Sequence, residues 1–355
     1  MLSEDYILDF SKKDTNNFFG YYDYSPFSKN DKYLIYLSYN NINELPNNKH
    51  YANINLVDFE KKKLIKSFKT NAFNFQDGCR MQWIDDYSFI FNTFEDNCLI
   101  AKIYNIKSDK FYTLNFPIYE YSINAKIGLT INYKTYSKYR RGYGYDFKNK
   151  NIKINDNGIF FIEFTTNKLT KIVDIDDLKK FKPLNSMFGC RHYIENIKFN
   201  TDGKYFYFFH RWDNEKNIYT RLFLYNIKKK NFSCILDSGK ATHLCWYDKN
   251  TIYGWISEDN FINNIRKKNI FNWRLAIYLK KVYHYLLPAH TYLAKKIISS
   301  GFFMIDINTL KRKKIDLKSI NQDGHPTWNQ KYKNILSCDT YVEEDKKQKL
   351  YLYNY

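Results

Sequence analysis

Apolar and polar side chains alternate along most of the chain in short runs, and each run ends in a cluster of Asn, Asp, Lys or Gly. Alternation with a period of two, bounded by turn residues, is typical of β-strands and hairpins. In the run 325–341, for example, HPTW begins one strand, a polar turn follows, and ILSCD forms the next strand. The pattern predicts an all-β protein.

The same strand–turn–strand unit recurs along the chain. Comparable runs lie at 23–38, 79–94, 121–134, 195–212 and 242–257, and second hairpins such as RLFLYNIKKKNFSCIL lie between them. A repeat of about 40 residues with about four strands is the blade signature of a β-propeller. A β-sandwich is the alternative, but it does not require one motif six times. We predict a single propeller domain over residues 1–355, with six or seven four-stranded blades, the seventh in the irregular stretch Arg140–Asn157.

Composition limits the partners. The net charge is +19, from 56 basic and 37 acidic residues, which favours anionic lipid, acidic glycan or nucleic acid. No homogeneous Lys/Arg run and no nucleic-acid-binding motif is present, so nucleic acid is not a predicted partner.

Targeting signals are not evident in the sequence. MLSEDYILDFSKKD has neither a basic nor an apolar segment of signal-peptide type, and no apolar run reaches the length of about 18 residues that a spanning helix needs. The six cysteines form no CxxC pair, which argues against a zinc ribbon and favours free thiols. We expect a cytoplasmic protein, with the inner membrane face as a peripheral location.

One segment departs from the strand pattern. Residues 261–300 contain eight basic residues and no Asp or Glu, and apolar side chains from Phe271 to Leu286 recur at helical spacing. The sequence predicts a basic, partly helical insertion within the fifth unit. It could lie on an anionic membrane surface, close as a lid, dock a partner, or pack on the propeller rim.

Polar residues open the inner strands, which in a propeller line the central channel. Asn196, His243 and His325 each stand three residues before an aromatic side chain, and His210 and Arg211 end the second strand of the fourth unit. The residues expected to converge are Asp23, Arg80, Gln82, His192, Asn196, His243, Gln322 and His325.

His243, Gln322 and His325 could meet across adjacent blades. Imidazoles with an amide oxygen suit a divalent metal such as Mn²⁺ or Zn²⁺ rather than Ca²⁺. The alternative is that each histidine makes an ordinary hydrogen bond at the start of a strand.

Several short motifs, in this order, resemble the propeller-type polysaccharide lyases, the oligogalacturonate lyase and ulvan lyase-like group: GYYDYSPFSKNDKYLIYL, QDGCRMQWI, RRGYGYD, FFHRW, THLCW and QDGHPTWN…LSCDTY. The resemblance covers most of the chain outside 261–300. It implies a metal held by several His and a Gln from a Gln-x-x-His-x-His run. Gln322 and His325 match that run, whereas its last His is Thr327 here.

The resemblance also implies β-elimination on a uronate-containing glycan. Such a reaction needs a group that neutralises the substrate carboxylate, a base that removes the adjacent proton, and an acid for the leaving oxygen. Arg80, Arg141 or Arg211 would serve the first role, His192 or His210 the second, and Tyr143 or Tyr145 the third. Further substrate contacts are expected from Gln82, Asn196, Trp246 and Trp328.

Two other functions stay open. A non-catalytic propeller could bind a glycan, an anionic membrane or a protein partner in surface-polysaccharide assembly, since one fold hosts many functions. A hydrolase would need two carboxylates facing each other, and the strand openings offer Asp23, Asp77, Glu195 and Asp323 without singling out a pair.

Overall fold

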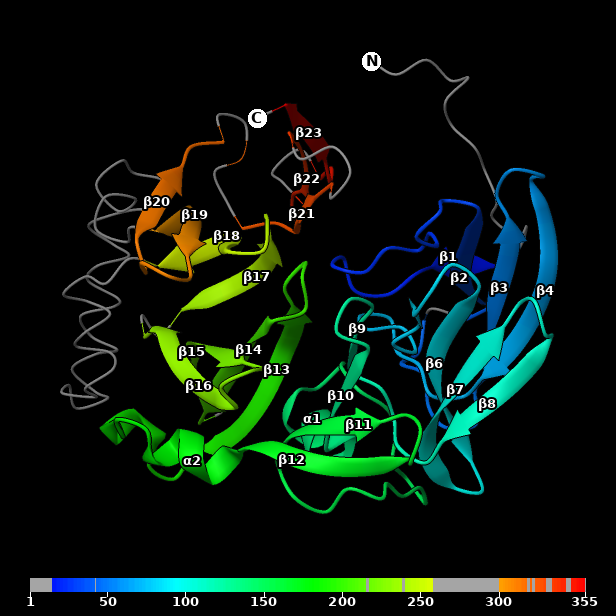
Figure 1. The fold of residues 1–355 in the computed structure, drawn as a ribbon, viewed down its shortest axis with the longest axis horizontal. Helices are drawn as coiled ribbons and strands as arrows, with labels where there is room; N and C mark the ends of the chain where they lie inside the picture. Colours follow the sequence, from blue (N-terminus) through cyan, green and yellow to red (C-terminus); the bar gives the residue numbers. More distant parts are fainter. Residues whose placement is uncertain are drawn as a thin grey trace. The chain divides into compact units, whose positions relative to one another are not determined.

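The structure, a computed structural model, describes residues 15–41, 43–214, 217–237, 240–257, 300–317, 320, 323–329, 334–342 and 346–354. The chain divides into two compact units, Met1–Ile172 and Val173–Tyr355. Strands dominate both units (Figure 1). The predicted insertion falls outside the described residues except at Ser300, so its helical character and its membrane contact stay predictions.

Among its described residues, the first unit contains three four-stranded sheets, in which each strand pairs with its neighbours in sequence. Their strands are β1 (Asn16–Phe18), β2 (Tyr33–Tyr39), β3 (Ala52–Asp58) and β4 (Lys63–Thr70); β5 (Gln82–Trp83), β6 (Ser88–Glu95), β7 (Cys98–Asn105) and β8 (Lys110–Leu114); β9 (Glu120–Ser122), β10 (Ile127–Ile131), β11 (Gly158–Glu163) and β12 (Lys168–Asp174), the last ending just past the boundary of the unit.

The second unit contains two four-stranded sheets and a sheet with three strands among the described residues. Their strands are β13 (Arg191–Phe199), β14 (Tyr205–Asp213), β15 (Ile218–Asn226) and β16 (Asn231–Leu236); β17 (Ala241–Trp246), β18 (Thr251–Ser257), β19 (Ser300–Asp306) and β20 (Arg312–Ile315); β21 (Pro326–Trp328), β22 (Ile335–Asp339) and β23 (Leu350–Asn354).

Sheets of this up-and-down order are the blades of a β-propeller, and the predicted fold is confirmed with six blades. A seventh blade at 140–157 is wrong: this stretch contains no strand and pairs only through the isolated bridge between Cys98 and Asn151. The first inner strand is also misplaced by the sequence. It is β1, and the predicted strand around Phe27 is reduced to one bridge with Leu34.

Two short α-helices interrupt the strand pattern in the part of the chain that the structure describes. Helix α1 (Tyr133–Tyr139) begins where the Asn132 side chain accepts a hydrogen bond from the amide of Thr135. Helix α2 (Ile175–Lys180) has Asp174 as its N-cap, acidic residues in its first turn and lysines in its last, an order that complements the helix dipole. A 3₁₀ turn, η2 (Asn185–Met187), follows. No helix among the described residues is long and apolar enough to cross a bilayer.

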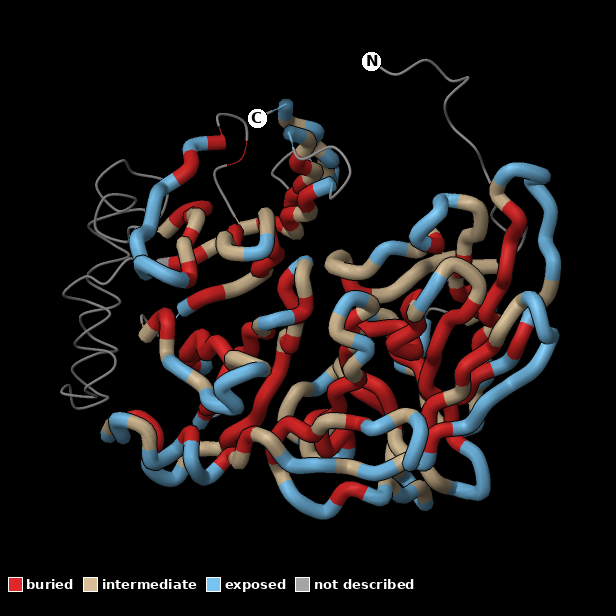
Figure 2. Tube along the Cα trace, viewed as in Figure 1, coloured by how far each residue is buried: buried red, intermediate tan, exposed pale blue. Residues whose placement is uncertain are grey.

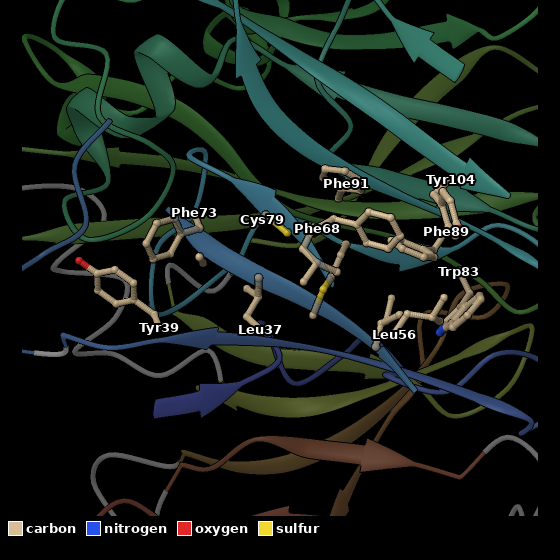
Figure 3. Packing of buried hydrophobic residues seen from close by; sticks show 14 residues of the cluster. Leu37, Tyr39, Leu56, Phe68, Phe73, Cys79, Trp83, Phe89, Phe91 and Tyr104 are labelled. Atoms are coloured by element: carbon tan, nitrogen blue, oxygen red, sulfur yellow. The ribbon is translucent and has the colours of Figure 1, made fainter. Parts of the chain in front are cut away.

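Aromatic and branched side chains fill the space between neighbouring sheets. In the first unit Leu37 and Leu56 of one sheet pack against Trp83, Phe89 and Tyr104 of the next (Figure 3). In the second unit comparable clusters join β14 and β15 to β17, and β18 and β19 to β21 and β22. Middle strands such as β6 and β14 are buried along almost their whole length, whereas the outer strands β4, β8, β20 and β23 are largely exposed (Figure 2).

Candidate functional site

Two predicted site residues lie side by side in the second unit. His243 is on β17, and His325 immediately precedes β21, a strand that packs against β17. Their ring centroids are 4.3 Å apart. Both rings remain partly accessible, with side-chain exposures of 13% and 27%. The structure therefore brings together the two histidines that the sequence placed in adjacent blades.

Each of these imidazoles faces a carboxylate through Nδ1. His243 Nδ1 lies 3.0 Å from Asp323 Oδ1, and His325 Nδ1 lies 2.8 Å from Asp339 Oδ1. Burial raises the pKa of Asp339, but hydrogen bonds from His325 outweigh it, so the pKa of this carboxyl lies below its ordinary value. A carboxylate accepts hydrogen bonds only, so it stabilises the proton on Nδ1 of its histidine.

The backbone at His243 adopts a left-handed conformation. Its φ is 45°, and the register of β17 against β18 shifts between Thr242 and Leu244, so His243 occupies a β-bulge. Asn196 and Arg80, which also lie three residues before the aromatic of an inner strand, both have φ of 52°. Left-handed φ costs a non-glycine residue about 1–2 kcal/mol. A bulge thus sets the backbone direction at His243 and Asn196, and Arg80 shares their left-handed φ.

The donor set of the pair fits a first-row metal ion. Imidazoles whose second nitrogen bonds a carboxylate are common metal ligands. With metal–nitrogen distances of about 2.1 Å, two imidazole centres on one ion would be roughly 4.5–5.3 Å apart, slightly more than the observed 4.3 Å. The described residues contain no cluster of three or more His, Cys, Asp or Glu suited to a metal. Gln322, the third predicted ligand, lies outside the described residues.

His192 and His210 form a second, different pair. His192 Nδ1 lies 2.9 Å from His210 Nε2, and His192 Nε2 lies 3.1 Å from the carbonyl oxygen of Met187. His210 is 0% exposed. Burial lowers the pKa of His192, and burial together with the neighbouring His192 and Arg221 lowers the pKa of His210 well below its ordinary value. Both rings are therefore neutral at neutral pH.

The tautomers of this pair follow from the carbonyl. Because the carbonyl oxygen of Met187 can only accept, His192 carries its proton on Nε2 and accepts at Nδ1 from His210 Nε2. His210 Nδ1 is then a bare nitrogen, and it has no hydrogen-bond partner among the described residues. The contacts of His192 and His210 include neither His243 nor His325.

Arg211 is also enclosed. Its Nη1 lies 2.8 Å from Glu195 Oε1, and both side chains are buried. The cation over the Trp212 ring is Arg221, not Arg211, at 5.4 Å from the ring centroid. Arg211 is therefore held by an ion pair to the neighbouring strand β13 and not by the adjacent Trp212.

Arg80 and Gln82 tie parts of the first unit together. Arg80, itself buried, bonds Asp77 at 2.9 Å and the Tyr24 hydroxyl at 3.0 Å, and its guanidinium lies 3.9 Å from the centre of the Tyr119 ring. Gln82 Oε1 accepts from the Tyr121 amide at 2.8 Å. These contacts occupy the side chains with protein partners.

The RGYGYD loop places its two tyrosines differently. Tyr145 is buried, its hydroxyl lies 3.0 Å from Asn92 Nδ2, and burial raises its pKa well above the ordinary value. Tyr143 is half-buried beneath the guanidinium of Arg140, which lies 4.2 Å from the ring centre. Arg141 is exposed. Of the predicted site residues in this loop, Tyr145 is enclosed, whereas Tyr143 and Arg141 are accessible.

The two tryptophans predicted to contact substrate are core residues of their blades. Trp246 is buried and its Nε1 donates to the Lys198 carbonyl at 3.1 Å, and Trp328 is buried against Tyr247 and Tyr253. Asn196 is half-buried. Of the carboxylates considered for a hydrolase, Asp77 and Glu195 are each paired with an arginine, and Asp323 faces His243.

Sequence reasoning assigned no role to three residues beside the histidine pair. Asp339 ends β22 opposite His325, Thr242 Oγ1 lies 2.6 Å from Asp323 Oδ2, and the half-exposed ring of Tyr341 lies 5.7 Å from that of His325. The signal for Asp339 was its place at the end of the hairpin partner of His325. Thr242 and Tyr341 have no such signal.

Fold and site together define a six-bladed β-propeller with a carboxylate-held histidine pair. No protein-family model matches the chain, and no curated protein matches it. Similar solved structures include TolB from Acinetobacter baumannii, with TM-score 0.39 and 11% identity over 84% of this chain and 53% of that one. The chain thus spans about half of the TolB chain.

Two oligogalacturonate lyases are also similar in structure. The enzyme from Vibrio parahaemolyticus has TM-score 0.40 and 9% identity over 97% of this chain and 92% of that one. A lyase in complex with manganese has TM-score 0.41 and 10% identity over the same shares, 97% and 92%. At such values the function has to be argued from the residues of this chain.

Proposed function

We propose that this protein binds a uronate-containing oligo- or polysaccharide and cleaves it by β-elimination, with a divalent metal ion held by His243 and His325. The observation that carries the proposal is the pair of adjacent imidazoles, each with its Nδ1 on a carboxylate. The motifs shared with the polysaccharide lyases and the net charge of +19 support it.

The metal and the protein would divide the chemistry. A bound divalent ion would neutralise the substrate carboxylate and so make the neighbouring C–H more acidic. His243 and His325 would hold that ion through Nε2, with Gln322 as a further ligand. Tyr341, whose half-exposed ring lies 5.7 Å from that of His325, would take the proton from that carbon and return it to the leaving oxygen.

A second function rests on a different observation. The candidates for proton transfer, His210 and Tyr145, are buried among protein partners, and Arg211 is in a buried ion pair. A propeller that binds an acidic glycan without cutting it requires only the metal pair and accessible basic residues. This is the alternative that the experiment must separate from a lyase.

The test uses purified protein, a panel of uronate-containing glycans, and Mn²⁺ or a chelator. A lyase generates unsaturated uronates, whose ultraviolet absorbance grows only with metal and disappears in His243→Ala and His325→Ala. His50→Ala, far from the pair in sequence and paired with Asn47, is the matched control. Metal-dependent glycan binding without new absorbance would establish the binding propeller instead. If the protein neither binds nor cleaves any glycan of the panel, both proposed functions are overturned.

A further inference from the structure

Asp323 links two blades through the residues of the candidate site. The aspartate stands just before β21, whereas the residues it bonds are on β17 of the preceding sheet. Its Oδ1 lies 3.0 Å from His243 Nδ1, and its Oδ2 accepts from Thr242 Oγ1 at 2.6 Å. The Gly324 amide also donates to Oδ1 at 3.0 Å. One carboxylate therefore fixes both the ring of His243 and the bulge that carries it.

Asp339 holds His325 within a single blade. Its Oδ1 accepts from the His325 backbone amide and from His325 Nδ1, each at 2.8 Å. Gln348 Nε2 donates to Oδ2 at 3.3 Å. Gly324 permits this arrangement, because a Cβ at that position would overlap the carbonyl oxygen of Asp339. The backbone and the ring of His325 are thus tied to one side chain.

We propose that Asp323 and Asp339 are positioning residues, which lock both imidazoles in the Nδ1–H tautomer and leave the lone pair of each on Nε2. A neutral imidazole divides its single proton between two nitrogens, and an acceptor-only group at Nδ1 decides which one carries it. The use of Nε2 as a metal ligand rests on the proposed function. The assignment of the tautomer does not rest on the proposed function, because it follows from the hydrogen bonds that Asp323 and Asp339 make with the two histidines.

The contrast with His192 supports this assignment. There the acceptor-only group, the carbonyl of Met187, faces Nε2 and imposes the opposite tautomer. The two pairs therefore predict opposite proton positions in one protein. This difference can be read directly from imidazole nitrogen chemical shifts in metal-free protein labelled with ¹⁵N-histidine.

The experiment compares wild type with Asp323→Ala, Asp323→Asn, Asp339→Ala and Asp339→Asn, and uses Asp248→Asn, in the β17–β18 turn, as the control. In wild type and in the control, His243 and His325 should show a protonated Nδ1 and a bare Nε2. Each Ala variant should shift the nitrogens of its own histidine toward the Nε2–H tautomer, with a smaller shift in the Asn variant, whose amide oxygen can still accept. Unchanged nitrogen shifts in variants that remain folded by circular dichroism would overturn the proposal.

Mn²⁺ titration supplies the second readout. Loss of either carboxylate should weaken Mn²⁺ binding about 10- to 100-fold, as is usual when the hydrogen-bond partner of a ligating histidine is removed. Full affinity in variants with altered tautomers would overturn the positioning role. A wild type that shows the expected tautomers and binds no Mn²⁺ would contradict the proposed function while supporting the tautomer assignment.

Discussion

The two histidine pairs of the second unit have the same residue type and opposite surroundings. His243 and His325 are partly exposed, and each ring has its own carboxylate. His192 and His210 are buried, bonded to each other, and surrounded by Trp212 and Phe223. The first arrangement favours binding of a cation, and the second favours two neutral rings. What a histidine can do here is decided by the acceptor beside it rather than by its position in a blade.

Removal of the exposed pair should have the largest effect. The double variant His243→Ala/His325→Ala should lose all measurable Mn²⁺ binding, because both imidazole ligands are gone. The His192→Ala variant should bind Mn²⁺ within about threefold of wild type, a difference of ~0.7 kcal/mol. Electron paramagnetic resonance of free Mn²⁺ measures both. Equal losses in the two variants would contradict the division between the pairs.

The free energy of unfolding should depend more on the buried pair than on the exposed pair. His210→Ala leaves a cavity in a fully buried site and removes the donor to His192, so it should lower the free energy of unfolding by about 3 kcal/mol. His325→Ala, at a partly exposed position, should cost less than about 1 kcal/mol. Urea unfolding followed by tryptophan fluorescence compares them. A larger loss in His325→Ala would show that its pair is the structural one.

Low pH should destabilise the fold through the buried pair, His192 and His210. The pKa values of His192 and His210 lie below 6.5 in the folded chain, so near pH 5.5 the unfolded chain binds more protons than the folded one. The free energy of unfolding should therefore fall as the pH drops below about 6.5. Between pH 7.5 and 5.5 the wild type should lose about 1 kcal/mol more than His210→Gln. An identical loss in both proteins would assign the pH dependence to other groups.

The smallest effect concerns the link between blades. Thr242→Val keeps the shape of the side chain and removes the hydroxyl that donates to Asp323 at 2.6 Å. The free energy of unfolding should fall by about 1 kcal/mol. The imidazole nitrogens of His243 should keep their shifts, since Asp323 Oδ1 is untouched. A changed tautomer would mean that Thr242, and not the carboxylate alone, fixes the ring.

The sequence predicted much of the fold because strand alternation and turn residues repeat with each blade. It also predicted that His243 and His325 would meet, since both open inner strands of adjacent blades. The same reasoning could not predict that His210 is buried. Strand β14 is buried on both faces, so alternation along it says nothing about which side chains reach a ligand.

The sequence did not predict the Glu195–Arg211 ion pair or the bulges of the inner strands, for different reasons. Glu195 and Arg211 meet through the pairing register of β13 and β14, which shifts by a bulge after Glu195. That bulge is carried by Asn196, and the bulge at His243 is carried by a histidine, so no glycine marks either position. The loop at 140–157 was ambiguous because its aromatic residues suit strands, whereas Gly142 and Gly144 adopt left-handed φ of 87° and 71°.

The left-handed backbone at His243 has an evolutionary consequence. Glycine would relieve about 1–2 kcal/mol of backbone strain at this position, but it would lose the hydrogen bond to Asp323 and the contact with the His325 ring. Selection for thermal resistance alone should therefore weigh strain against these contacts, whereas selection for activity should keep the histidine. A library of variants sorted first by heat and then by ligand binding would measure both demands at this position.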